Sequence, residues 1–307
     1  MAQAATQRGV GLALAALGAI AFSGKAIIVK LAYRHGVDPV TLIMLRMLFA
    51  LPFFLAMAWW AGRGKAPLTQ RDWWGVIWLG FCGYYLSSFL DFAGLQHITA
   101  SLERLIMYLN PTLVVVLGWL LFQRRITGAH AFAMAVSYAG VLLVFGQELA
   151  AHGTSGASGS RTALGAALVF GGAVTYATYM VFSGQLVQRL GSLRLAGLAT
   201  GVACLFCLVQ FALLRPLDSV LQVAPQVVWL SMLNAVVCTV VPVLLVMMAI
   251  ERIGASATAQ TGMIGPLSTL LMGVVILGEP LTVWVAAGTL LVLAGIYLFS
   301  RARVPAS

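Results

Sequence analysis

Two stretches of this chain are versions of one another and decide the fold: GLQHITASLERLIMYLNPTLVVVLGWLLFQRRIT at residues 94–127 and AIERIGASATAQTGMIGPLSTLLMGVVILGEPLT at residues 249–282. At an offset of 155 residues they share small residues, a proline, a glycine and a threonine, which pair as Ala100-Ser101 with Ala255-Ser256, Pro111 with Pro266, Gly118 with Gly273 and Thr127 with Thr282. One offset that aligns all of these residues indicates an internal duplication. The openings of the two halves match more loosely, residues 19–26 against 173–180 at an offset of 154.

The composition places both copies in a membrane. Hydrophobic residues make up 61% of the 307 residues and charged residues only 8%, whereas a soluble domain has about 25% charged residues. A transmembrane helix needs about 20 apolar residues. Ten stretches qualify: Gly9–Val29, Pro39–Ala61, Trp73–Leu95, Ser101–Phe122, Ala129–Phe145, Leu164–Val187, Leu195–Leu214, Val227–Ile250, Ser256–Leu277 and Val283–Ser300.

The duplication and the ten stretches together predict an all-α integral membrane protein. Five spans fall in each half, so the second half enters the membrane from the opposite side and the two five-helix repeats are inverted. We expect the first repeat at 1–146, a flexible Gly- and Ser-rich linker at 147–161 and the second repeat at 162–307. Inverted repeats are typical of secondary transporters, because two such halves can expose one site to either side of the membrane.

The basic residues predict the orientation. If both termini are cytoplasmic, eleven Lys and Arg residues lie at cytoplasmic helix ends and five at outer ends, which agrees with the positive-inside rule. We therefore expect a multi-pass protein of the bacterial inner membrane with both termini in the cytoplasm. The net charge of +10 is not interpreted as nucleic-acid binding, because the basic residues form no continuous patch.

The two quoted stretches, together with GEPLT at Gly278–Thr282, resemble the EamA-type members of the drug/metabolite transporter superfamily. The resemblance covers nearly the whole chain and implies a ten-helix exporter of metabolites, amino acids among them. Within the superfamily the chain is similar to the bacterial aromatic amino-acid exporters. One departure is plain: the first half has Gln-Arg-Arg-Ile at residues 123–126, where the second has Gly-Glu-Pro-Leu at residues 278–281.

Two prolines mark candidate gating positions. Pro111, after Asn110, lies in the fourth predicted span, and Pro266, after Gly265, lies in the ninth. Proline removes a backbone donor and clashes with the preceding turn, so we expect each helix to bend or open there. Paired interruptions in corresponding spans indicate a substrate site, although packing kinks without substrate contact are the alternative.

Five charged residues lie within the predicted spans of the first half, and buried charges in membranes tend to be functional. They are Lys25, Arg46, Asp91, Glu103 and Arg104, whereas the second half has Gly201, Thr258 and Ala259 opposite Arg46, Glu103 and Arg104. In one interpretation Lys25 or Arg46 binds the carboxylate of a substrate. In the other, Asp91 and Glu103 pair with the basic residues and hold the outer side closed, and a third possibility is that Lys25 extends to the membrane interface. Asp91 or Glu103 could also couple transport to protons.

Uncharged side chains complete the predicted site. Tyr84, Tyr108, Tyr176 and Tyr179 could line a cavity for amphipathic ligands, and Ser88, Asn110, Asn234 and Gln260 are further polar groups within the spans. Ordinary packing and hydrogen bonds between helices are the alternative roles for these residues.

These observations favour a transporter over its rivals. No nucleotide-binding loop of the form G-x-x-x-x-G-K-[ST] is present, no catalytic constellation suggests a membrane enzyme, and no rings of like charge suggest a channel. We therefore expect an alternating-access exporter of small amphipathic metabolites, amino acids first and drugs or nucleosides second. We expect no cofactor, metal or nucleic acid; the partners are a small-molecule substrate and the lipid bilayer, and the protein is expected to be a monomer.

Overall fold

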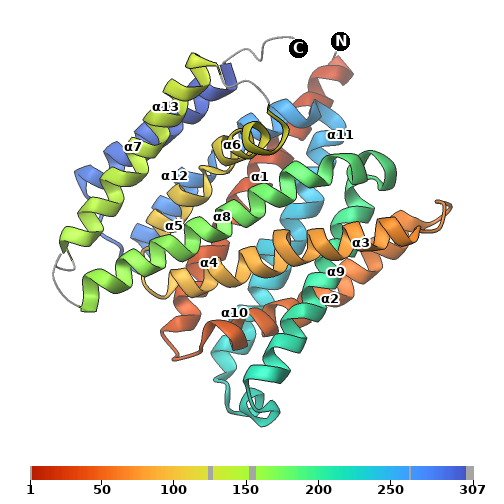
Figure 1. Ribbon diagram of the computed structural model, residues 1–307, viewed down its shortest axis with the longest axis horizontal. Helices are drawn as coiled ribbons and strands as arrows, with labels where there is room; N and C mark the ends of the chain where they lie inside the picture. The colour runs from red at the N-terminus through yellow and green to blue at the C-terminus, as the bar shows by residue number, and fades with distance from the viewer. Residues whose placement is uncertain (1, 124–126, 152–156, 263, 302–307) are drawn as a thin grey trace.

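The computed structural model describes residues 2–123, 127–151, 157–262 and 264–301, and in that part of the chain all regular structure is helical (Figure 1). The first half comprises α1 (Ala2–Tyr33), α2 (Pro39–Gly62), α3 (Gln70–Leu79), η1 (Gly80–Leu86), α4 (Ser87–Leu95), α5 (Ala100–Met107), α6 (Asn110–Phe122) and α7 (Gly128–Ala151). The second comprises α8 (Ala157–Leu190), α9 (Ser192–Leu214), η2 (Leu217–Gln222), α10 (Pro225–Ala235), η3 (Val236–Val240), α11 (Val241–Thr261), α12 (Ile264–Met272), η4 (Gly273–Leu277) and α13 (Val283–Arg301).

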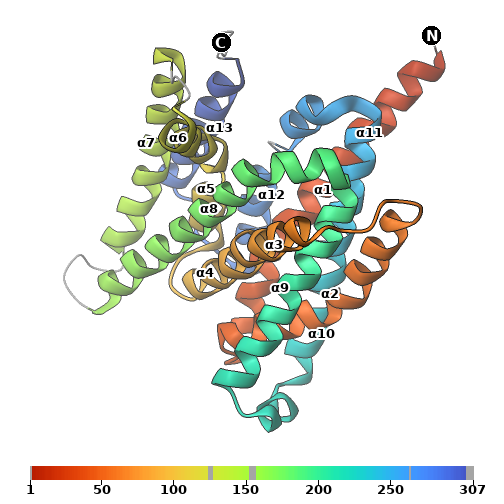
Figure 2. The same ribbon diagram turned by 45° about the vertical axis from the view of Figure 1, so that its right-hand side comes forward.

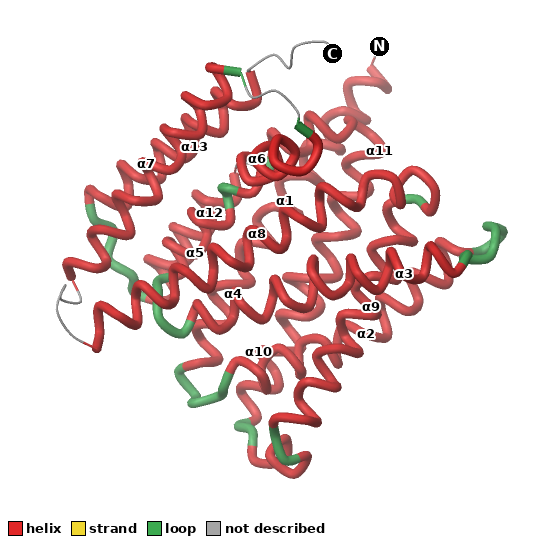
Figure 3. The backbone as a smooth tube through the Cα atoms, in the orientation of Figure 1, coloured by secondary structure: helices red, strands yellow, loops and turns green. Residues whose placement is uncertain are grey.

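These helices form the ten predicted spans. In the described part of the chain, eight helices are long and apolar enough to cross a membrane, and the shorter apolar helices Ile264–Leu277 and Val283–Phe299 follow them. The third span consists of α3, η1 and α4 in one continuous rod, and the eighth begins with α10 and η3 and continues into α11. Short loops join most of the spans (Figure 3).

The predicted start of the ninth span is wrong. Sequence matching placed it at Ser256, but α11 runs on to Thr261 and the next helix begins at Ile264. In the first half Thr99 starts α5, because its side chain accepts a hydrogen bond from the Leu102 backbone N–H at 3.1 Å. The residue equivalent to Thr99 is Gly254, which has no side chain to cap a new helix, so the helix continues through it.

The helices also extend into both ends of the predicted linker 147–161. Helix α7 continues to Ala151 and α8 begins at Ala157, while residues 152–156 lie outside the described residues. The addition to α7 is Gln-Glu-Leu-Ala-Ala, all good helix formers, whereas the addition to α8 is Ala-Ser-Gly-Ser-Arg.

The spans pair across the two halves. Helix α2 packs along α9, α1 along α11, α4 along α8 and α7 along α13, and α5 crosses α12. A twofold axis in the membrane plane maps the second span onto the seventh, the fourth onto the ninth and the fifth onto the tenth. The same axis maps the pair formed by the first and eighth spans onto the pair formed by the sixth and third spans. The observed pairing is therefore the one that an inverted repeat requires.

The fifth and tenth spans, α7 and α13, stand at one edge of the bundle in both views (Figure 2). Their backbones meet at small residues: a Cβ added to Gly140 would lie 2.6 Å from the Gly288 carbonyl oxygen, and one added to Gly288 would lie 2.7 Å from that of Gly140. Small residues allow membrane helices to approach closely. This pair packs mainly on itself and leaves the other eight spans to form the central bundle.

Two kinds of irregularity occur at equivalent positions of the halves. The fourth span pauses at Tyr108 and Leu109 before Pro111, and the chain also leaves the helix at Gly262 before Pro266. The predicted interruption near Pro111 thus lies within the fourth span, whereas the break near Pro266 lies between α11 and α12, before the ninth span begins. In addition, η1 and η3 are π-helical segments that coincide at the 155-residue offset, and π-helical turns are frequent at functional sites.

Because the number of spans is even, both termini lie at one end of the bundle, the near end (Figure 1). Among the described residues, the opposite end, the far end, holds the connections 34–38, 96–99, 215–224 and 278–282.

Candidate functional site

A buried ion cluster connects three spans of the first half. Lys25 on α1 places its Nζ 2.5 Å from Asp91 Oδ2 on α4 and 3.4 Å from Glu103 Oε1 on α5. Both carboxylates are fully buried, and the Lys25 side chain is 16% exposed. Asp91 Oδ1 and both Glu103 oxygens have no hydrogen-bond partner, so the two acids depend on Lys25 and the neighbouring Arg104 for charge compensation.

Arg104 extends the cluster into the second half. Its Nε donates to Thr269 Oγ1 on α12 at 3.0 Å and its Nη2 donates to the Phe22 carbonyl oxygen on α1 at 3.0 Å. The same guanidinium approaches Glu103 Oε2 at 3.9 Å. One side chain therefore ties the fourth span to the first and the ninth.

Arg46 lies apart from these ion pairs. It is 4% exposed, its Nη2 donates to Ser88 Oγ at 3.1 Å, and its guanidinium lies over the Phe92 ring, 4.7 Å from the centroid. Its Nε has no hydrogen-bond partner, and no carboxylate of the described residues forms an ion pair with it, although Asp91 is within electrostatic range. Counted with the partly buried Lys25 and Arg104, three cations face two buried carboxylates.

Tyrosines form a second cluster, between the third and sixth spans. Tyr84 on η1 and Tyr179 on α8 have hydroxyl oxygens 3.3 Å apart and rings in an edge-to-face arrangement 5.1 Å apart. Tyr176 stacks on Tyr179 with ring centroids 5.6 Å apart. Tyr84 and Ser88 are four residues apart, and Asp91 follows three residues later. The third span thus presents aromatic, hydroxyl and carboxylate groups in succession along one side.

The two clusters are centred on equivalent residues of the inverted repeats, Lys25 and Tyr179, although the partners of these two residues do not correspond. At the crossing of α1 with η3, a Cβ added to Gly24 would lie 3.0 Å from Cys238 Sγ; at the crossing of α8 with η1, a Cβ added to Gly83 would lie 2.4 Å from Tyr179. Gly83 and Cys238 correspond at the 155-residue offset, and Lys25 corresponds to Tyr179 at the offset of 154 that aligns the first and sixth spans. We name these the charged crossing (Lys25 with its partners Asp91 and Glu103) and the aromatic crossing (Tyr84, Tyr176 and Tyr179).

Other predicted site residues form hydrogen bonds at the helix breaks before Pro111 and Pro266. Tyr108 donates from its hydroxyl to the Gly262 carbonyl oxygen at 2.8 Å, and Ser23, which sequence reasoning missed, donates to that of Gly265 at 2.9 Å. Asn110 donates from its Nδ2 to the Met107 carbonyl oxygen at 2.6 Å. These bonds satisfy carbonyls that the broken helices leave open.

The remaining predicted residues fall at different places. Pro111 is the second residue of α6 and Pro266 the third residue of α12, so both lie in first turns, where proline is tolerated. Asn234 on α10 is 1% exposed, and neither atom of its amide has a hydrogen-bond partner. Gln260 lies on α11, and its side chain is outside those that the structure describes.

Sequence reasoning also missed two acids at the far end. Glu279, in the GEPLT stretch, accepts hydrogen bonds from the start of α5, and Glu148 on α7 accepts one from the Thr99 backbone N–H at 3.4 Å and another from the Thr99 hydroxyl. In the sequence alone, the GEPLT stretch indicates only the family resemblance. Its position just before the tenth span was the signal that it faces the loop between the third and fourth spans.

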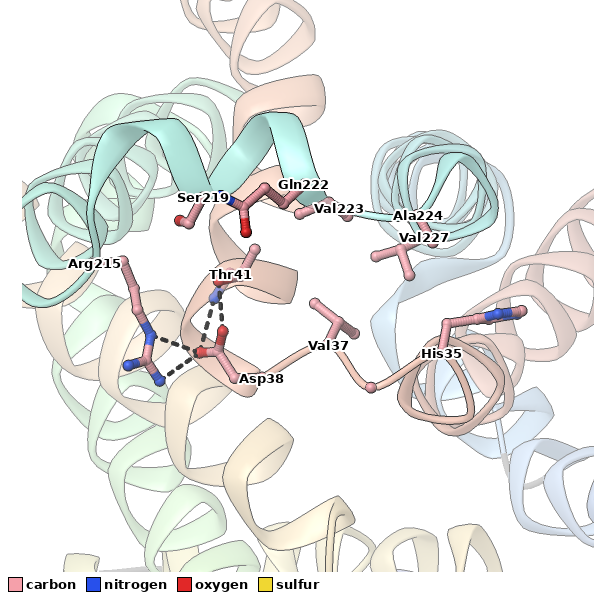
Figure 4. A pocket seen from close by; sticks show the side chains of 11 residues that line it. His35, Val37, Asp38, Thr41, Arg215, Ser219, Gln222, Val223, Ala224 and Val227 are labelled. Carbon is pink, nitrogen blue, oxygen red and sulfur yellow. Dashed lines mark hydrogen bonds and ion pairs between the residues drawn. The ribbon is translucent and has the colours of Figure 1, made fainter.

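A separate pocket of about 170 Å³ lies at the far end, between the α1–α2 loop and the segment that includes η2 (Figure 4). Asp38 caps α2, accepting from the Val40 and Thr41 backbone N–H groups, and forms an ion pair with Arg215 at 3.2 Å. Burial raises the pKa of Asp38, but the hydrogen bonds from Thr41 and Arg215 outweigh it and leave the pKa below its ordinary value. No residue of the charged or aromatic crossing lines this pocket.

In the described part of the chain, no group of three or more His, Cys, Asp and Glu side chains is arranged to hold a metal ion. The four cysteines are free and buried. Three of them, Cys204, Cys207 and Cys238, lie within electrostatic range of Arg46.

Comparison with known proteins agrees with this architecture. The model of the EamA-like transporter family matches residues 9–146 and again 163–301. An uncharacterized transporter of Bacillus subtilis, YcbK, is 30% identical over 270 residues, which cover 86% of this chain and 84% of that protein. An uncharacterized transporter of Archaeoglobus fulgidus is 24% identical over 93% of this chain and 95% of its own length. A crystal structure with 19% identity superposes with a TM-score of 0.60 over 94% of this chain and 95% of the other, which supports the fold.

Proposed function

Because this chain belongs to the EamA-like transporter family, we propose that it exports amino acids with aromatic or other hydrophobic side chains, by alternating access. The observation that carries the proposal is the unpaired Arg46. Three cations, of which Arg46 is fully buried and Lys25 and Arg104 partly so, face two buried carboxylates in the first half, and a buried charge is costly unless it is paired. A substrate carboxylate at Arg46 would make the numbers of buried cations and anions equal.

The neighbouring groups suit the rest of an amino acid. Asp91 Oδ1 has no hydrogen-bond partner and can accept from an α-ammonium group, while the other oxygen of Asp91 stays with Lys25. Tyr84 lies seven residues before Asp91, about 10 Å away along a helix that rises about 1.5 Å per residue, a distance comparable to the length of an amino acid with a large side chain. The aromatic crossing then offers an apolar surface with hydroxyl groups for that side chain.

Substrate binding and ion pairing, the two roles predicted for the charged residues, belong to two different side chains. Arg46 takes the substrate carboxylate, whereas Lys25 pairs with Asp91 and Glu103 and holds the first, third and fourth spans together. Alternating access is supported by the inverted repeat and by the helix breaks just before Pro111 and Pro266, which can act as hinges within the fourth span and between α11 and α12.

Orientation, direction and assembly belong to the same proposal. The excess of Lys and Arg at the near end supports a bacterial inner-membrane protein with both termini in the cytoplasm. The direction of transport rests on the resemblance to EamA-type exporters. We propose that a monomer is the working unit, because both crossings are built within one chain.

Uptake into proteoliposomes tests the substrate class. Phenylalanine is compared with its methyl ester, which lacks the carboxylate, with phenethylamine, and with phenylpropionate, which lacks the ammonium group. Nucleosides and cationic drugs complete the panel. We expect saturable uptake and counterflow of phenylalanine and weak uptake of the three analogues. Equal transport of the methyl ester, or transport of nucleosides or cationic drugs alone, would overturn the proposal.

A further inference from the structure

At the far end, the carboxylate of Glu279 binds the buried start of a helix from the other half. Its Oε1 accepts from the Ala100 backbone N–H at 2.7 Å, and its Oε2 accepts from the Ser101 backbone N–H at 3.3 Å and from the Ser101 hydroxyl at 2.7 Å. The first N–H groups of a helix have no partner within it, and the helix dipole favours a negative charge there. Glu279 therefore supplies both the hydrogen bonds and the charge that the start of α5 needs.

The start of α5 is completed by its own neighbours. Leu102 N–H donates to Thr99 Oγ1 at 3.1 Å, and Glu103 N–H donates to the Thr99 carbonyl oxygen at 3.1 Å. Glu148, which is 4% exposed, accepts from Thr99. Without Glu279, the N–H groups of Ala100 and Ser101 would need water, and both residues are buried.

The loop that carries Glu279 is also bonded elsewhere to the first half. Arg34 Nη2 at the end of α1 donates to the Leu277 carbonyl oxygen at 2.8 Å, and the Thr282 hydroxyl donates to Gln147 Oε1 on α7 at 3.3 Å. Gly278, with a φ of +73°, lets the chain reverse direction directly before Glu279. The loop thus joins α1, α5 and α7 across the far end.

The near end differs in sequence at the equivalent position. The loop between the fourth and fifth spans has arginine at 124 where the far-end loop has Glu279. An arginine cannot accept hydrogen bonds from a helix start, and its charge has the wrong sign for the helix dipole. The sequence therefore provides an acidic side chain at this position of the far-end loop and a basic one at the equivalent near-end position.

We propose that Glu279 is a latch that keeps the far end closed and must release α5 before the site can open there, so that the resting protein is closed at the far end. This inference rests on the alternating access proposed above and not on the identity of the substrate.

Labelling of the native cysteines tests the latch without a substrate. Cys204, Cys207 and Cys238 are buried around Arg46, and a charged, membrane-impermeant methanethiosulfonate reaches them only when one end opens. The full chain is labelled from each side of the membrane, in vesicles of both orientations, and the modified cysteines are identified by mass spectrometry. For Glu279→Ala we expect labelling from the far side to rise about 10-fold, the factor that the loss of about 1.4 kcal/mol from hydrogen bonds to a charged group would give.

Asp218→Asn is the matched control, since it removes an exposed acid from η2 at the same end, and we expect wild-type labelling. The latch is overturned if Glu279→Ala is labelled at the wild-type rate or if Asp218→Asn raises labelling equally. Failure of the amino-acid proposal would leave both labelling results unchanged, because no amino acid is present.

A covalent lock gives an independent test in case Glu279→Ala does not fold. A Cβ added to Gly273 lies 3.5 Å from Ser101 Oγ, so the double variant Ser101→Cys/Gly273→Cys is within disulfide reach once the flexible end of Glu279 moves aside. Oxidation should abolish labelling of the native cysteines from the far side, and reduction should restore it. Unchanged far-side labelling after oxidation would show that the far end does not open between α5 and η4.

Discussion

The charged crossing and the aromatic crossing stand at equivalent positions of one duplicated unit and hold opposite chemistry. In the first, Lys25 of α1 lies beside η3 and pairs with Asp91 and Glu103; in the second, Tyr179 of α8 lies against η1 and pairs with Tyr84. The helix geometry is shared, since both crossings use a small residue and a π-helical segment. The side chains differ, and so do the spans that supply the partners: Asp91 and Glu103 belong to the same half as Lys25, whereas Tyr84 belongs to the half opposite Tyr179.

This contrast shows how a symmetric scaffold can hold an asymmetric ligand. Inverted repeats need similar backbones so that the two halves can exchange conformations, but a ligand with a polar and an apolar end needs two different walls. Placing ions on one wall and tyrosines on the other satisfies both needs.

The largest expected effect is on the ion pairs of the charged crossing. Lys25→Met leaves two buried carboxylates without their cation, and breaking a buried pair from one side costs about 3–5 kcal/mol. The free energy of unfolding in detergent, followed by helical circular dichroism against denaturant, measures the loss. Lys25→Met/Asp91→Asn removes both charges of the closest pair and should recover part of that loss. A double variant as unstable as the sum of its single variants would contradict the pairing.

The next largest effect concerns Arg46, because its proposed role is to bind the substrate and not to stabilise the fold. Arg46→Met should weaken phenylalanine binding by about 10- to 100-fold, since hydrogen bonds to charged groups contribute about 1.5–3 kcal/mol. Binding is measured by scintillation proximity or calorimetry in detergent. Arg215→Met, which removes an arginine at the far-end surface, is the control and should bind phenylalanine as the wild type does. Equal affinity in Arg46→Met and wild type would separate Arg46 from the substrate.

The aromatic crossing should respond to ring shape more than to the hydroxyl group. Tyr179→Leu removes the edge-to-face contact with Tyr84 and the stacking with Tyr176, which are worth about 0.5–1.5 kcal/mol each. We expect the affinity for phenylalanine to fall about five-fold or more, the affinity for alanine to change little, and Tyr179→Phe to stay within about three-fold of wild type. Equal losses for alanine and phenylalanine would mean that Tyr179 serves packing only.

Much of this architecture could be predicted from sequence because it depends on patterns along the chain. The offset of 155 residues, the apolar runs and the proline pair predicted ten spans in two inverted halves, with interruptions near Pro111 and Pro266. The start of the ninth span could not be predicted that way. Gly254 replaces the capping Thr99, and one missing hydroxyl is enough to let α11 run to Thr261.

The candidate site was predictable by residue type but not by partner. Burial of Lys25, Arg46, Asp91, Glu103 and Arg104 follows from their place in apolar runs. Which acid faces which base depends on how α1, α2, α4 and α5 pack, and no spacing within one helix encodes that. The role of Glu279 was hidden for the same reason, since its partners lie about 180 residues earlier in the chain.

The surface ion pair between Asp38 and Arg215 is the comparison for the buried pairs, and its loss should have the smallest effect on stability. Asp38 caps α2 and pairs with the exposed Arg215. Loss of a helix cap costs about 1 kcal/mol, and exposed ion pairs add little. Since the pKa of Asp38 in the folded protein lies below its ordinary value of 3.8, the stability that its carboxylate contributes is present above that value and is lost as the pH falls through the folded pKa.

Asp38→Ala should therefore lower the free energy of unfolding by about 1 kcal/mol at pH 7. The gap in stability between the variant and the wild type should close in acid, as thermal melts in detergent at stepped pH would measure. If the gap stays constant down to the lowest pH at which both remain folded, the Asp38 carboxylate contributes no stability through its charge, and the contrast between surface and buried pairs rests on packing alone.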